Sequence, residues 1–207
     1  MRKLSIIVLL ITSPILIIGQ PNSAKYQNYL PTITTLQIGG DIGLISGGLG
    51  WEFGDKWSHN AEILGGYLPK FESDNSHFIL TVKYTASPFT LKLNNTISFE
   101  ALTFGLYISR IYGDGYWITQ PSQYPNDYFD LSTGVGANIF IGERINFALK
   151  NKGLVEQIGV YYELNVNETF VVSDTQSSYI NIFDHMNISF GAKLKMNYAK
   201  ILSPSKQ

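Results

Sequence analysis

The sequence predicts an all-β protein, an eight-stranded antiparallel up-and-down transmembrane β-barrel. First, most of the chain alternates apolar side chains with small or polar ones, which is the pattern of a strand with one apolar face. Second, the alternating segments run about 11 to 15 residues, against roughly 5 to 6 in soluble proteins and about 9 to 11 for a tilted membrane strand. Third, the other face carries residues such as Gly134, Gly136, Gly159 and Gly191 instead of a solvated row of Lys and Glu.

Residues 1–19 have the pattern of an export signal. The basic residues Arg2 and Lys3 precede an apolar stretch that contains Pro14 and is short for a membrane-spanning helix. We expect cleavage after Gly19. A retained N-terminal anchor helix is the alternative interpretation.

The first half of the barrel is predicted from three stretches. Residues 32–54 form either one long strand or a hairpin that turns at Ser46, Gly47 and Gly48, since paired glycines tolerate the positive φ of tight turns. Residues 57–68 and 77–87 then alternate as single strands. We adopt the hairpin because it gives an even number of strands, as in bacterial single-chain barrels.

The second half of the barrel is predicted from residues 97–110, 129–141, 154–167 and 184–198. Alternation is unbroken in the last of these segments, where every even position from Met186 to Tyr198 carries an apolar or aromatic side chain. No window of comparable length has a convincing helical period.

The predicted connections fall into two sets. Those after the second, fourth and sixth strands are short: Gly54 to Lys56, Pro88 to Asn95, and Arg144 to Gly153. Those after the third, fifth and seventh are longer: residues 69–76, 111–128 and 168–183. Long loops on one side, with both chain ends on the other, are typical of an outer-membrane barrel. We therefore assign residues 33–198 to the barrel, 20–32 to a periplasmic segment and 199–207 to a C-terminal tail.

Composition excludes several function classes. A net charge of −1 gives no electrostatic basis for binding nucleic acid. The absence of cysteine excludes a disulfide framework, a zinc knuckle, a thiol nucleophile and a lipid-modified cysteine. The sequence contains no metal-ligand cluster and no phosphate-binding glycine loop, so we expect no cofactor.

The chain resembles the small eight-stranded bacterial outer-membrane barrels of the OmpX-like and PagL-like group. Its last strand resembles their assembly signal, with Gly191, apolar Leu194 and Met196, and aromatic Tyr198. In that group the aromatic residue usually ends the chain, whereas here residues 199–207 follow it. The segments GWEFGDKW and GYLPKF are also similar to uncharacterised barrels of this kind. The resemblance implies location in the bacterial outer membrane, with lipid and lipopolysaccharide as neighbours.

Some members of that group modify lipid A, so the histidines are candidate catalytic residues. The resemblance to the deacylases implies a His and a Ser two positions apart on an outward strand face, but His185 is followed at that spacing by Asn187. His77 has Ser76 beside it, and adjacent strand residues point to opposite faces. His59 lies on the outward face near a short turn. We assign no catalytic residue.

Charged residues on the inward face predict a polar network inside the barrel. If the 69–76 loop closes symmetrically, Glu62 lies opposite Lys83, and such a pair avoids an uncompensated buried charge. Glu163, Lys193 and Lys195 share the inward parity and are expected to join this network.

The long-loop side carries the candidate recognition residues. Arg110 ends an outward row and is a candidate contact for a lipopolysaccharide phosphate, or a side chain that simply extends to water. The candidate surface in the 111–128 loop consists of Tyr116, Trp117, Tyr124 and Tyr128. These residues suit a glycan or protein ligand, or they fold the loop onto the rim.

We therefore expect a structural or surface-interaction role for an outer-membrane barrel whose lumen is filled by side chains. Eight strands are too few to enclose an aqueous pore, which disfavours a solute channel. Two alternatives remain open, a lipid-A-modifying barrel enzyme and a soluble periplasmic or secreted β-sandwich that binds a ligand.

Overall fold

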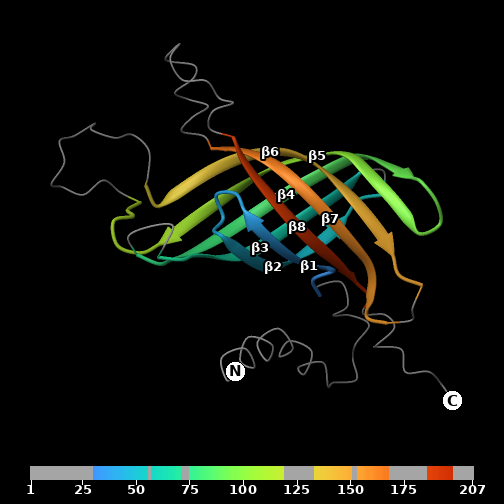
Figure 1. Cartoon of the computed structure of the whole chain (residues 1–207), viewed down its shortest axis with the longest axis horizontal. Coiled ribbons are helices and arrows are strands. Elements are labelled where there is room, and N and C mark those ends of the chain that lie inside the picture. The colour runs from blue at the N-terminus through green and yellow to red at the C-terminus, as the bar shows by residue number, and fades with distance from the viewer. Residues whose placement is uncertain are drawn as a thin grey trace, which may run out of the picture. The chain divides into compact units, whose positions relative to one another are not determined.

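The computed structural model describes residues 30–55, 57–70, 75–118, 133–150, 153–167 and 186–197. Its strands are β1 (Ile33–Gly39), β2 (Ile45–Phe53), β3 (Ser58–Leu68), β4 (His77–Lys92), β5 (Ile97–Tyr112), β6 (Val135–Ala148), β7 (Val155–Asn167) and β8 (Asn187–Met196). They form one closed antiparallel barrel in chain order (Figure 1). The prediction of an all-β, eight-stranded barrel is confirmed. Among the described residues, no helix is long and apolar enough to cross a membrane.

The strands are staggered as they pass around the barrel. Each strand pairs with the next, and β1 closes the sheet by pairing with β8. The row of register partners that starts at Tyr112 on β5 runs through β4, β3, β2, β1, β8 and β7 to Glu143 on β6. Glu143 lies opposite the irregularity between Glu100 and Thr103. The row therefore returns to β5 about ten residues before Tyr112, the residue at which it started. This offset is the shear of a barrel with tilted strands.

The first hairpin turns earlier than predicted. The turn occupies residues 40–44, and Ser46, Gly47 and Gly48 lie inside β2. Gly39, Gly40 and Gly43 adopt positive φ around the turn, which explains their position there. Gly48 instead allows a close approach, since a Cβ there would lie 2.0 Å from the backbone oxygen of Ile63.

Two further connections differ from the prediction. The expected turn at Pro88–Asn95 is a shorter one after Lys92, because a register shift between Ala86 and Phe89 accommodates Pro88 within β4. Strand β6 continues to Ala148, beyond the predicted 129–141, so Arg144 belongs to the strand and not to a turn. Residues 119–132 lie outside the described part of the chain.

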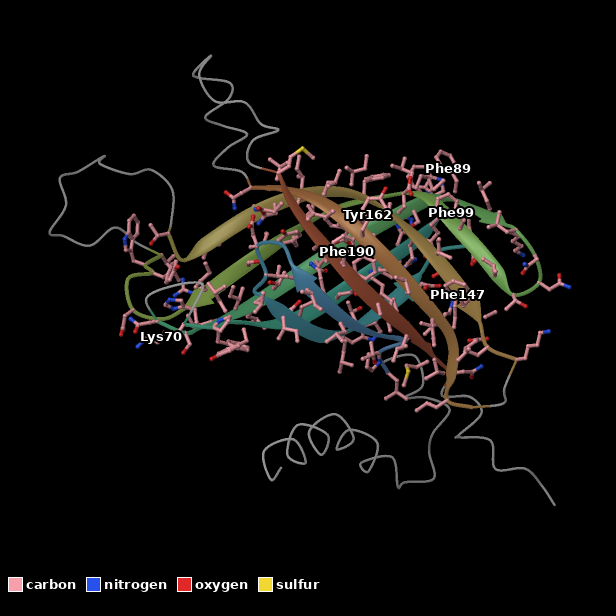
Figure 2. All side chains as sticks on the ribbon, in the orientation of Figure 1. Lys70, Phe89, Phe99, Phe147, Tyr162 and Phe190 are labelled. Atoms are coloured by element: carbon pink, nitrogen blue, oxygen red, sulfur yellow. The ribbon has the colours of Figure 1, made fainter. Side chains whose placement is uncertain are left out.

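Polar side chains fill the barrel and apolar ones cover it (Figure 2). The buried residues include Gln37, Glu62, Lys83, Glu100, Arg144, Glu163 and Lys193. The exposed ones include Leu36, Ile63, Val82, Leu106, Ile139, Val160 and Phe190. A soluble barrel such as a lipocalin encloses its ligand and faces water with the opposite arrangement.

A small apolar cluster lies inside the barrel beneath the β1–β2 turn. Ile42 is fully buried and clusters with Leu64, Tyr107 and Phe140. The turn places Ile42 inside the barrel, next to β3. Gly66 on β3 leaves the space for this turn, because a Cβ at Gly66 would lie 1.7 Å from the Ile42 backbone oxygen. The turn therefore fills part of the barrel interior near the loop-side opening, which we call the mouth.

Gly66→Ala is expected to lower the free energy of unfolding by about 1 to 3 kcal/mol, because the added methyl group displaces the backbone of the inserted turn. Gly65→Ala is the matched control, since its Cβ would lie at ordinary contact distance, 3.4 Å from the Phe78 ring and 3.9 Å from the Gly47 backbone oxygen. Urea titration of both variants in detergent measures the difference. Equal denaturation midpoints would contradict the close packing of the turn.

Candidate functional site

Lys83 is the centre of a buried ionic network in the lumen. Its Nζ lies 2.5 Å from Glu163 Oε2 and donates to Gln37 Oε1 at 3.0 Å. The Tyr161 hydroxyl donates to the same Gln37 oxygen at 2.9 Å. Nζ also lies 4.6 Å from the centre of the Phe140 ring, so an aromatic face adds to the carboxylate in stabilising the buried ammonium.

Glu62 belongs to a second buried pair. Lys193 Nζ donates to Glu62 Oε2 at 2.6 Å, and the Thr35 hydroxyl donates to Glu62 Oε1. Glu62 and Lys83 are register partners on β3 and β4, and both point inward. However, each forms its ion pair with a residue of another strand instead of with the other. The expected direct Glu62–Lys83 bridge is therefore replaced by two pairs that cross the lumen.

Two more ion pairs extend the network toward the turn side. Arg144 binds Glu100 through both carboxylate oxygens, with Nη2 at 2.7 Å from each, and the Asn146 amide donates to Oε1 at 2.7 Å. Lys195 pairs with Glu52 at 2.6 Å and is about one-third exposed. Lys195 therefore lies near the turn-side end of the barrel. It is not part of the central network of Lys83, Glu163, Glu62 and Lys193, which the sequence predicted it to join.

Sequence reasoning missed Arg144, Glu100 and Gln37. The sequence pattern predicts a turn at Arg144 because the predicted strand ends at residue 141, although Gly142, Arg144 and Asn146 continue the inward parity. Extending the alternation by three more positions would have found it. Gln37 carries the same signal on β1, where Thr35 and Gln37 alternate with Thr34 and Leu36.

The loop-side rim holds part of the predicted recognition surface. Tyr116 contacts His77 edge-on at 4.9 Å between ring centres, and the Trp117 backbone N–H donates to the Thr133 hydroxyl at 3.1 Å. Arg110 lies over the Tyr112 ring at 5.4 Å, and its Nη1 is buried without a hydrogen-bond partner among the described residues. Tyr124 and Tyr128 lie outside the described residues.

The described histidines occupy opposite ends of the barrel. His59 Nδ1 lies 2.7 Å from the Tyr84 hydroxyl, and its ring stacks on Phe53 at 5.6 Å. His77 is buried at the start of β4, on the loop side. His185 lies outside the described residues. In the described part of the chain, His, Asp and Glu side chains do not gather in any group of three that could hold a metal.

A hollow of about 340 Å³ opens at the loop-side mouth above the inserted turn. Its polar lining comes from Asp41, Ser109, Asn138 and Asn167. Burial raises the pKa of the Asp41 carboxyl group, and an Asn187 amide that donates to it at 2.9 Å opposes this effect in part. Asn138 Oδ1 is buried and has no partner among the described residues. This hollow offers hydrogen-bond acceptors to a small polar ligand.

The lumen and the mouth therefore differ in chemistry. Ion pairs neutralise the charges of the lumen, whereas at the mouth the buried Asn138 oxygen has no partner among the described residues. Comparison with protein-family models, with curated proteins and with solved structures gives no match.

Proposed function

We propose that the chain is a bacterial outer-membrane β-barrel with a structural or surface-interaction role. The observation that carries this proposal is the reversed polarity of the barrel, with ion pairs inside and large apolar side chains outside. Monomeric soluble proteins rarely expose contiguous apolar patches larger than a few hundred Å². Hydrocarbon would cover such a wall, and the closed sheet leaves no unpaired strand edge in the lipid.

The distribution of aromatic side chains supports the same proposal. Near the β2–β3 turn, the His59 ring stacks with Phe53, Trp57 and Tyr84. At the opposite, loop-side end, Phe78 packs on Tyr112 with 6.1 Å between ring centres. Two aromatic levels on the outer wall are typical of a barrel whose rims meet the two membrane–water interfaces.

The alternatives receive less support. A single closed sheet differs from the two packed sheets of a β-sandwich. Large buried side chains such as Tyr107, Lys83 and Gln37 occupy the lumen that a solute channel needs open. A lipid-modifying enzyme needs a base beside a nucleophile, whereas the described His59 hydrogen-bonds a tyrosine within an aromatic stack. The proposed surface-interaction role therefore depends on residues at the loop-side mouth, where Tyr116 and Trp117 would contact a glycan or protein ligand.

Expression of the full chain in a Gram-negative bacterium should place it in the outer-membrane fraction, with a gel mobility that changes on boiling in detergent. The physical reason is that a closed barrel resists unfolding by detergent until it is heated. A chain that lacks residues 1–19 is the control and should remain inside the cell without the mobility shift. Recovery of folded, monodisperse protein from the periplasm without detergent would contradict the proposal.

A further inference from the structure

The outer wall carries one charge where an apolar side chain is expected. Away from the strand ends, Glu143 is the one charged residue on the outward face of the described strands. On β6 it lies between Ile141 and Ile145, both of which are exposed. An ionisable side chain on a lipid-facing wall is costly and marks a functional site by default.

The surroundings of Glu143 form a shallow groove of about 370 Å³. Apolar side chains from β5 to β8 line it: Phe99, Ile145, Phe147, Val160 and Phe190. Tyr162 is the register partner of Glu143 on β7, so the two side chains lie side by side on the outer wall. Figure 2 shows Phe99, Phe147, Tyr162 and Phe190 on one face of the barrel.

The groove lies toward the turn side of the barrel. Glu143 faces the irregular stretch of β5 between Glu100 and Thr103, only a few residues from the start of that strand at Ile97. In an outer-membrane orientation the turn side faces the periplasm. In that orientation Glu143 would lie in the periplasmic half of the outer wall, toward the lipid headgroups of the inner leaflet.

The charge of Glu143 is not balanced by an ion pair with any of the described residues. The neighbouring guanidinium, that of Arg144, points inward to Glu100. Among the described residues no Lys or Arg forms an ion pair with Glu143, and its register partner Tyr162 is neutral. A carboxylate in an apolar groove complements a ligand that joins a hydrogen-bonding cation to a hydrocarbon chain.

We propose that this groove binds a phospholipid whose headgroup ends in a primary ammonium, the ethanolamine class. The ammonium donates to the Glu143 carboxylate, and an acyl chain lies against Phe147, Val160 and Phe190. This proposal rests on the proposed membrane location. A choline headgroup has no N–H to donate, and the carboxylate repels the net negative charge of a phosphatidylglycerol. The groove should therefore distinguish the three lipids.

Native mass spectrometry of the detergent-purified barrel, mixed with equal amounts of the ethanolamine, choline and glycerol phospholipids of one acyl composition, tests the proposal. The wild type should retain the ethanolamine lipid about tenfold better than the choline lipid, as one charge-assisted contact allows. Glu143→Gln should abolish this preference. Glu156→Gln removes an exposed acid near the start of β7, outside the groove, and should leave the preference unchanged.

Unchanged lipid preference in Glu143→Gln, or equal retention of the three lipids by the wild type, would overturn the groove assignment. Those outcomes leave the membrane location intact, because the mobility shift on boiling reports the folded barrel independently. A wild-type chain that is soluble without detergent would overturn both proposals.

Discussion

Lys83→Met is expected to lower the free energy of unfolding by about 3 to 5 kcal/mol, the cost of leaving one partner of a buried ion pair without the other. The substitution removes the ammonium that binds Glu163 and Gln37 while keeping a side chain of similar length. It also removes the cation from the face of Phe140. Urea titration of the barrel in lipid vesicles, followed by tryptophan fluorescence, measures the change.

Two further variants distinguish the energetic contribution of the ion pair from that of lost packing. Lys83→Met combined with Glu163→Gln should recover part of the stability, since no unpaired carboxylate remains. Lys195→Met is the matched control, because its pair with Glu52 is partly exposed and is worth about 0 to 1 kcal/mol. If Lys83→Met lowered the free energy of unfolding no more than Lys195→Met does, the central network would not stabilise the barrel.

Leu106→Arg is expected to cost about 2 to 4 kcal/mol when the barrel is folded in a bilayer, because the guanidinium then replaces a lipid-facing side chain near mid-strand. Leu106 is 51% exposed. If water surrounded it, the same substitution would change the stability by no more than about 0.5 kcal/mol. The measurement is the unfolding free energy in phospholipid vesicles.

Leu93→Arg is the control for the outer wall. Leu93 is 64% exposed but lies in the turn between β4 and β5, so its replacement should cost about 0 to 1 kcal/mol. Equal, small effects at Leu106 and Leu93 would contradict a hydrocarbon environment around the barrel. A large effect at Leu106 alone would support it independently of cell fractionation.

The strands could be predicted because their signal is local. Alternation along β8 or β7 needs only the chemistry of successive residues, and it correctly predicts the inward parity of Lys193 and Glu163. The first turn could not be placed, because glycine serves two purposes in this segment. Gly40 adopts positive φ in the turn, whereas Gly48 allows the backbone of β3 to approach closely. Composition alone does not distinguish these two uses of glycine.

The ion pairs of the lumen could not be predicted for a different reason. The register placed Glu62 beside Lys83, but long side chains in a narrow barrel reach strands that are distant in sequence. Which carboxylate Lys83 reaches depends on the stagger of the whole sheet, to which every turn contributes. An error of a few residues at the end of β6 was enough to omit Arg144.

The seam between β1 and β8 has a consequence for biogenesis. It joins Ile33–Gly39 to Ser189–Lys195, so the cylinder cannot seal until the last strand has been synthesised. Contacts of such sequence separation form slowly, and until they form both outer strands of the nascent sheet present free backbone amides and carbonyls. A chain truncated before residue 187 would therefore lack the partner of both β1 and β7 and would leave the backbone edges of these two strands unpaired.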